Sequence, residues 1–340
     1  MKNLLILILV TVSFTAVAQT DSADYFLQEG IKAKNERRWQ VAQNNLQKAV
    51  QLNASNAAAH KELGLVYAEQ RKYDLAKQSF AEVLKKNAND ADVNAQMANL
   101  YFWTRKWNEA IQYAKKAQEL KAPLKTNYII GKSYYEMEDY GQAFPYLQNA
   151  LKEEPTNAEI PYIIGRSFVD MSNYRSAAGY FVQAIQTDTT KPRWVYETAL
   201  NFAAIPDDVN AIKYYELAAA RGYKTDNDYY ENLSISYLGI GQADKCIEAM
   251  KKVLEKKPAD ITLLYGVADV YYKIGKYQDA IDYWDKILLY DKKNARALYM
   301  IGMAYQKKGD TQKGQQLCDQ AIAMDPSLKN MRTQKMQVGL

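Results

Sequence analysis

The chain has 340 residues, of which 48% are apolar and 24% charged, with only 15 glycines and 8 prolines. This composition is ample for a packed core and poor in the turn residues that β-proteins need. The 44 basic and 39 acidic side chains are interleaved along the chain and leave a formal charge of +5, a balance that argues against nucleic acid as a partner.

The N-terminus has the pattern of a secretory signal. A short basic start, Met1-Lys2-Asn3, is followed by an apolar run from Leu4 to Phe14 and by Ala16-Val17-Ala18. The run is too short for a membrane span, which needs about 20 residues, so a retained anchor is the weaker interpretation. The pattern predicts cleavage after Ala18. We expect an exported mature chain, periplasmic or secreted, with no stable membrane insertion after cleavage.

Small residues recur along the rest of the chain with a period of 33 to 35 positions. This is the period of solenoids built from helix pairs. The recurring residues are Ala42, Ala76, Ala110, Ala143, Ala177, Ala211, Cys246, Ala280 and Gly314. Twelve positions before each lies a second small residue, where we expect two helices to cross closely: Gly30, Gly64, Ala98, Gly131, Gly165, Ala199, Ser234, Ala268 and Gly302.

Eight of the nine units carry an aromatic residue three positions after that second small residue, from Tyr67 to Tyr305. In the second unit the series reads Leu63-Gly64-x-x-Tyr67, Tyr73, Ala76, Phe80 and Leu84. The sequence here resembles the tetratricopeptide repeat family over residues 23–328. The resemblance implies an all-α fold, a right-handed α-solenoid or superhelix of about nine helix-turn-helix units stacked on one continuous core.

The domain organisation follows from the period. We expect a signal peptide over 1–18, one solenoid domain over 19–340 and a C-terminal capping segment over 329–340. The repeats are expected at 23–56, 57–90, 91–123, 124–157, 158–191, 192–226, 227–260, 261–294 and 295–328. The sixth unit departs from the pattern at Ile205-Pro206-Asp207-Asp208 and has a longer spacing to Cys246, which predicts altered stacking over 205–227. Pro145 is expected in the first turn of its helix, where it is tolerated.

The sequence offers no catalytic constellation. Cys246 and Cys318 stand two repeats apart, too far for a disulfide, and are expected as small core residues. The single histidine, His60, is expected to pack between helices, and with it alone neither a catalytic triad nor a zinc site can be assembled. Carboxylates are plentiful but fall at solvated helix positions such as Glu136. We predict a non-enzymatic protein with no metal and no cofactor.

In the resembled family the first helix of each unit lines a concave groove. Carried over to this chain, the groove positions of units three to six hold aromatic and basic side chains that suit an interface. Tyrosines at these positions also serve helix packing in many members of the family. The candidate partner-binding residues are Asn99, Phe102, Trp103, Lys125, Tyr128, Lys132, Tyr135, Tyr162, Arg166, Arg193 and Tyr196.

Two functions fit this surface. In the first, the chain is a protein-protein interaction scaffold or assembly factor of the bacterial cell envelope. It binds an extended peptide or protein segment in the groove, with aromatic anchors and a basic cluster that selects acidic groups. In the second, it is an envelope carbohydrate or cell-wall binding protein whose aromatic rings stack on sugars. The first is the favoured interpretation, and salt-sensitive binding to a peptide array would distinguish it from the second, which predicts capture by insoluble cell wall.

Overall fold

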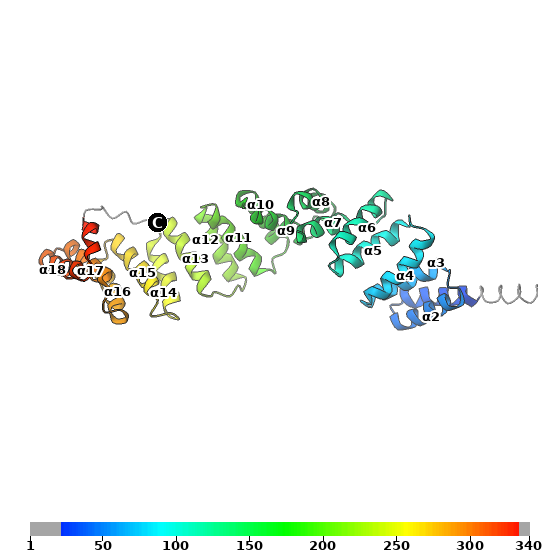
Figure 1. The fold of residues 1–340 in the computed structure, drawn as a ribbon, viewed down its shortest axis with the longest axis horizontal. Coiled ribbons are helices and arrows are strands. Elements are labelled where there is room, and N and C mark those ends of the chain that lie inside the picture. The colour runs from blue at the N-terminus through cyan, green and yellow to red at the C-terminus, as the bar shows by residue number, and fades with distance from the viewer. Residues whose placement is uncertain (1–21, 333–340) are drawn as a thin grey trace, which may run out of the picture. The chain divides into compact units, whose positions relative to one another are not determined.

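The computed structural model describes residues 22–332, and every regular element in that range is a helix (Figure 1). The chain divides into two compact units, and the boundary along the sequence lies between Met171 and Ser172. Unit 1 holds the described residues up to Met171, and unit 2 those from Ser172 onward. The expected all-α solenoid of helix-turn-helix repeats is confirmed, while its right-handed sense stays a prediction. The predicted signal peptide, residues 1–18, lies outside the described residues.

The helices alternate between the first and the second helix of each repeat. The first helices are a helix over residues 22–35, α3 (Ala57–Glu69), α5 (Ala91–Trp103), α7 (Asn127–Glu136), α9 (Glu159–Asp170), α11 (Pro192–Ala204), α13 (Asn227–Gly239), α15 (Ile261–Lys273) and α17 (Ala295–Lys308). The second helices are α2 (Trp39–Leu52), α4 (Tyr73–Lys86), α6 (Trp107–Glu119), α8 (Tyr140–Glu153), α10 (Tyr174–Thr187), α12 (Asp208–Ala220), α14 (Ala243–Leu254), α16 (Tyr277–Tyr290) and α18 (Thr311–Met324).

Local sequence explains where these helices begin and where they end. Asp90 and Asp260 each accept a backbone N–H of the first helical turn and so cap α5 and α15. After each first helix the chain reverses through one residue with positive φ, and glycine occupies this position only in the last three repeats. The reversing residues are Arg37, Arg71, Arg105, Glu138, Ser172, Pro206, Gly241, Gly275 and Gly309.

The small residues lie where the two helices of a repeat cross. A Cβ atom on Gly64 would stand 2.6 Å from the Phe80 ring, and one on Gly131 would stand 2.8 Å from Cγ of Leu147. The small residues of the second helices, from Ala42 to Ala280, are fully buried. The close helix crossings predicted from the period are therefore confirmed, because no larger side chain fits between the two helices.

Consecutive repeats are joined by hydrogen bonds to tyrosine hydroxyl groups. Lys115 on α6 donates to the Tyr134 hydroxyl on α7 at 2.8 Å, and Lys251 on α14 donates to Tyr271 on α15 at 2.9 Å. Tyr237 on α13 donates to Glu216 on α12 at 2.7 Å. Each bond links the second helix of one repeat to the first helix of the next. This role accounts for tyrosine, rather than phenylalanine, at these aromatic positions.

Several smaller expectations can be compared with the structure. Cys246 and Cys318 are buried and unbridged, as predicted. Pro145 is the sixth residue of α8, so its expected place in the first helical turn was wrong. Beyond α18, Pro326–Arg332 forms a short 3-10 helix that contacts α18, and Leu328 within it is buried. This 3-10 helix includes the first four residues of the predicted capping segment, 329–332, and the rest of that segment lies outside the described residues.

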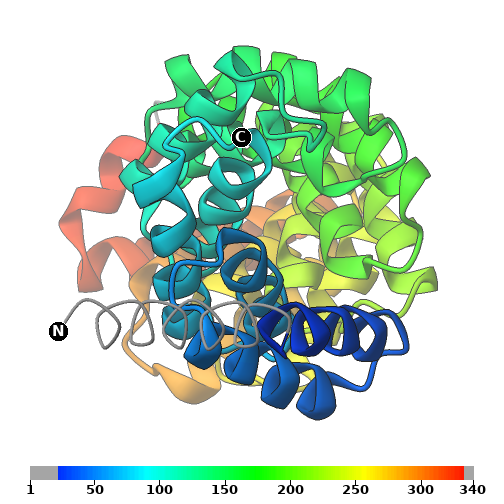
Figure 2. The same cartoon turned by 90° about the vertical axis from the view of Figure 1, so that its right-hand side faces the viewer.

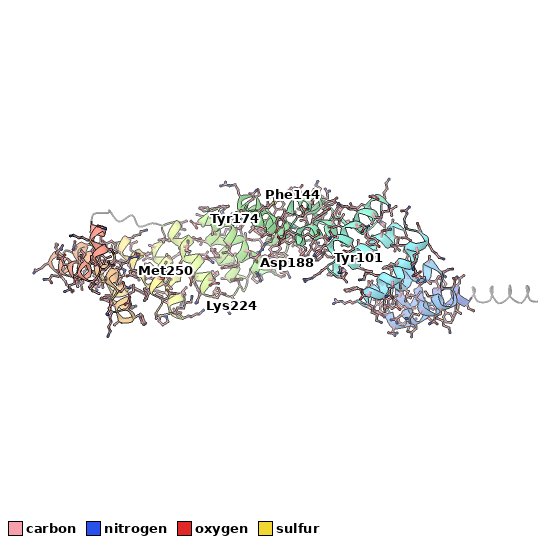
Figure 3. All side chains as sticks on the ribbon, in the orientation of Figure 1. Tyr101, Phe144, Tyr174, Asp188, Lys224 and Met250 are labelled. Atoms are coloured by element: carbon pink, nitrogen blue, oxygen red, sulfur yellow. The ribbon has the colours of Figure 1, made fainter. Side chains whose placement is uncertain are left out.

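Within each unit, helices that follow one another along the chain also lie side by side, as the blue and cyan hairpins of unit 1 show in Figure 2. Side chains fill the spaces between them (Figure 3). Tyr101, labelled in that view, stacks on Tyr113 with ring centroids 5.3 Å apart. In unit 1, α5 also contacts α7, and α7 contacts α9. The first helices of three successive repeats therefore form one continuous face.

Candidate protein-binding surface

The candidate residues are divided between the two units. Nine of them lie in unit 1, on α5, on α7 with the residue Lys125 before it, and on α9. Arg193 and Tyr196 lie on α11 in unit 2. Because α5, α7 and α9 adjoin, the structure brings the unit 1 residues onto one face, which is the continuous part of the predicted site.

Phe102 and Trp103 are neighbours in sequence with opposite environments. Phe102 is only 7% exposed, because the rings of Trp107 and Tyr128 pack edge-on against it at 5.7 and 6.0 Å. Trp103, the last residue of α5, is 66% exposed. Its ring contacts that of Phe102 at 5.8 Å. Trp103 is thus a large apolar side chain that packs against Phe102 and is otherwise exposed to solvent.

Lys132 is held within the chain. Its ammonium group forms a salt bridge with Glu159 of the next repeat and donates to the Tyr128 hydroxyl at 3.2 Å. It also lies 5.9 Å from the centre of the Phe102 ring. Burial, followed by the nearby Glu159 carboxylate, raises the pKa of Tyr128. The Lys132 charge is therefore already neutralised by a carboxylate from the neighbouring repeat.

The other basic candidates in unit 1 also have partners. Arg166 lies 3.8 Å from Asp170 of the same helix, and Lys125 donates to the backbone carbonyl of Glu153 at 2.6 Å. The same arrangement occurs upstream, where Lys61 pairs with Asp90 and Asp92 at 3.3 and 3.1 Å. These pairings reduce the attraction that the basic cluster can exert on an acidic ligand.

The remaining candidates of unit 1 are half-buried. Tyr135 contacts the ring of Tyr140 at 5.9 Å. Burial, and next the Asp170 carboxylate, raises the pKa of Tyr135. Asn99 and Tyr162 are also of intermediate exposure. These residues can line a contact surface, but each keeps much of its side chain against neighbouring helices.

In unit 2, Tyr196 is occupied by its own chain. The ring of Tyr223 stacks on it at 4.3 Å with an interplanar angle of 12°, and Asn232 donates to its hydroxyl at 3.0 Å. Tyr196 is consequently only 8% exposed. Tyr223 comes from the 205–227 segment, whose longer spacing the sequence had marked. Arg193 remains exposed and pairs with Glu197 at 3.0 Å.

Sequence reasoning missed a set of exposed residues at the ends of α7 and α9. Met137 and Met171, which follow these helices directly, are 41% and 45% exposed. Glu136, Glu138 and Asp170 beside them are exposed carboxylates. The sequence could have indicated them, because they place acidic residues at helix C-termini, where basic residues are favoured.

Among residues 22–332 no group of three or more His, Cys, Asp or Glu side chains is placed to hold a metal ion. His60 is half-buried on α3, where its Nε2 lies 3.0 Å from the backbone carbonyl oxygen of Ala54.

No helix within the described range is both long and apolar enough to cross a membrane. The polar groups of the unit 1 face suit binding by contact and hydrogen bonding.

The alternation of paired helices, the buried small crossings and the exposed first-helix face define a helical-repeat solenoid. Models of the tetratricopeptide repeat match residues 27–92, 162–227 and 265–328, together more than half of the chain, and a second such model matches 67–122. The chain belongs to the tetratricopeptide repeat family. Residues 103–184 also match the model of subunit 3 of the anaphase-promoting complex, or cyclosome.

Several known proteins are similar to parts of this chain in sequence or in fold. BBSome complex member BBS4 of Bos taurus is 35% identical over 81 residues, which are 24% of this chain and 16% of that protein. The chain thus spans less than a fifth of that relative. Among solved structures, YrrB, a TPR protein with an unusual peptide-binding site, is 16% identical with a TM-score of 0.43, covering 55% of this chain and 97% of YrrB. The structure of Naa15/Naa10 bound to HypK-THB is 12% identical with a TM-score of 0.48, covering 92% and 65%.

Proposed function

We propose that this tetratricopeptide repeat protein is a non-enzymatic scaffold or assembly factor that binds a peptide or protein segment on the face of α5, α7 and α9. The observation that carries the proposal is Trp103, which is 66% exposed at the end of α5 while its ring rests on Phe102. Helical solenoids use extended faces of this kind to bind partners.

Trp103 has the properties of an interface anchor. Its indole offers a large contact area with few rotatable bonds, and the packing against Phe102 restricts it further before a partner arrives. Such residues commonly contribute most of the energy of an interface. Lys132 and Tyr128 both contact Phe102, on which the tryptophan rests, and they place polar atoms beside it. We expect them to form the rim around the tryptophan.

The cellular setting is part of the proposal. The N-terminal pattern of Met1 to Ala18 predicts export, and a periplasmic or secreted scaffold in the bacterial envelope would meet its partner there. Carbohydrate binding through the same residues has less support. Stacking on sugars needs open ring faces, and of the predicted aromatic residues Phe102 and Tyr196 are buried, while Trp103 alone is exposed.

Site-specific crosslinking tests the proposal. We would place a photoreactive phenylalanine analogue at Met137 and, as a matched control, at Ile274, which is 38% exposed at the corresponding turn of unit 2. In native cells, Met137 is expected to give a discrete protein adduct that Trp103→Ala removes, because losing such an anchor costs about 2 kcal/mol, or ~thirtyfold in affinity. Adducts of equal yield from Ile274, or adducts that do not depend on Trp103, would count against the proposed face.

A further inference from the structure

Three consecutive first helices of unit 1, α5, α7 and α9, carry exposed residues at their C-terminal ends. Successive helices of the hairpins alternate in direction, so α5, α7 and α9, which contact one another in turn, run the same way and have their C-termini on the same side of unit 1. Six exposed residues at these ends form what we call the helix-end surface. They are Trp103, Glu136, Met137, Glu138, Asp170 and Met171.

The apolar part of this surface is made of Trp103, Met137 and Met171, which are between 41% and 66% exposed. Methionine side chains are unbranched and polarizable, so they adapt to ligands of varied shape. A tryptophan and two methionines exposed at successive helix ends therefore suit a ligand with several apolar side chains.

The charged part is negative over α7 and α9. Neither Glu136 nor Glu138 forms a salt bridge within the described part of the chain. The nearest basic residues of α7 and α9 are committed, since Lys132 pairs with Glu159 and Arg166 with Asp170. Arg105 and Lys106 follow Trp103 in the turn after α5. Unpaired carboxylates therefore dominate at the α7 end, Asp170 at the α9 end is paired with Arg166, and cations occur at the α5 end.

These carboxylates stand where they disfavour the fold. A helix C-terminus carries a partial negative charge, so a carboxylate in its last turn is destabilising. Yet α7 ends on Glu136 and α9 on Asp170, and neither helix has a basic residue in its last turn. A residue that opposes the charge preference of its helix terminus, with no other interaction to offset the cost, is expected mainly at functional positions. Glu136 lacks such compensation, because no lysine or arginine among residues 22–332 forms a salt bridge with it.

Resting on the proposed function, we propose that the helix-end surface receives a basic segment of a partner protein. Apolar side chains of that segment lie on Trp103 and the two methionines. Its lysine or arginine side chains lie toward Glu136 and Glu138, where the C-terminus of α7 adds to the attraction. A cation next to Trp103 also interacts favourably with the face of the indole. The partner chemistry is therefore opposite to that suggested by the basic residues of the sequence.

The test uses the full chain and two synthetic helical peptides with the same leucine positions, one carrying lysines and the other glutamates. Binding would be measured by fluorescence anisotropy at two salt concentrations. The variant is Glu136→Lys with Glu138→Lys. The control is Glu248→Lys with Asp282→Lys, which changes the net charge equally on α14 and α16 of unit 2. Thermal unfolding checks the fold, and lysines at the end of α7 are expected to leave it intact.

We expect the lysine peptide to bind the wild-type chain and the control variant alike. Its affinity should fall at least about tenfold in the Glu136→Lys, Glu138→Lys variant and in Trp103→Ala, with a smaller salt dependence in the former. Equal affinity in the variant and the control would overturn the inference. Preferential binding of the glutamate peptide that depends on Trp103 would also overturn it while leaving the proposed function intact. Trp103-independent binding, or none of either peptide, would defeat both.

Self-association is a further outcome that decides the question. Sedimentation would compare the wild-type chain with the Glu136→Lys, Glu138→Lys variant. We expect no concentration-dependent dimer of the wild-type chain that is lost in the variant. Such a dimer would assign the helix-end surface to a second copy of the chain instead of a basic partner segment.

Discussion

The ends of the first helices differ between the two units. In unit 1, α3, α7 and α9 end on Glu69, Glu136 and Asp170, and α5 ends on the exposed Trp103. In unit 2, α15 ends on Lys273 and α17 on Lys308, as a helix dipole favours. The other first helices of unit 2, α11 and α13, end on the uncharged Ala204 and Gly239, so destabilising carboxylates at this position occur in unit 1 and stabilising lysines in the last two repeats of unit 2. The binding surface that we propose for unit 1 accounts for this difference.

The helix crossings, in contrast, are alike in both units. A Cβ on Gly131 of unit 1 would stand 2.9 Å from the backbone nitrogen of Leu147, and one on Gly302 of unit 2 would stand 2.7 Å from the carbonyl oxygen of Gly314. Positions that determine the fold are therefore shared, and the divergence is confined to the surface. This separation lets a repeat protein change its ligand without changing its core.

The largest expected effect concerns the shared crossings. Gly131→Ala and Gly302→Ala should each lower the free energy of unfolding by roughly 1–3 kcal/mol, because the added methyl group meets backbone atoms that cannot move aside. Gly266→Ala is the control, since its Cβ would meet nothing nearer than 3.5 Å. Thermal and denaturant unfolding followed by circular dichroism would measure all three. A stable Gly302→Ala variant would show that the crossings of the two units are not equivalent.

An intermediate loss of stability is expected when the lysine–tyrosine hydrogen bonds between repeats are removed. Tyr134→Phe in unit 1 and Tyr271→Phe in unit 2 each remove a hydroxyl that accepts a hydrogen bond from lysine. Each should cost about 1 kcal/mol of stability. The exposed Tyr290 provides the control, Tyr290→Phe, which should change little. If only one of the two core variants lost stability, the stacking of repeats would differ between the units.

The smallest effect tests the comparison of helix ends itself. Glu136→Lys should raise the free energy of unfolding and Lys273→Glu should lower it, each by about 0.3–1 kcal/mol, because a C-terminus favours a cation. Both changes should shrink as salt is added. Denaturant titrations at low and high salt would measure them. Destabilisation by Glu136→Lys would mean that its carboxylate has a structural role, which removes the functional argument.

Much of the fold could be predicted from the sequence, because it depends on local periodicity. The small residues at Gly64 and Ala76 and the aromatic Tyr67 recur at fixed offsets, and those offsets alone define the helix pair. The confirmed burial of Cys246 follows from the same register.

The surface could not be predicted to the same extent, because its charges depend on contacts between repeats. Lys132 and Glu159 are 27 residues apart and meet only through stacking. Tyr196 is covered because the longer loop before α13 brings Tyr223 onto it. Glu136 belongs to a set of carboxylates that sequence reasoning treated as solvated surface, since neighbouring helix ends are not visible in one repeat.

Hydrogen exchange with and without the lysine peptide tests the central claim most directly. It compares the turn after α7, residues 136–139, with the corresponding turn after α15, residues 273–276, in the same molecule. We predict slower exchange on peptide addition in the first turn and around Trp103, with no change in the second, because the unit 1 helix ends bind the basic segment. Protection of the turn after α15, with none at Trp103 or residues 136–139, would contradict the account.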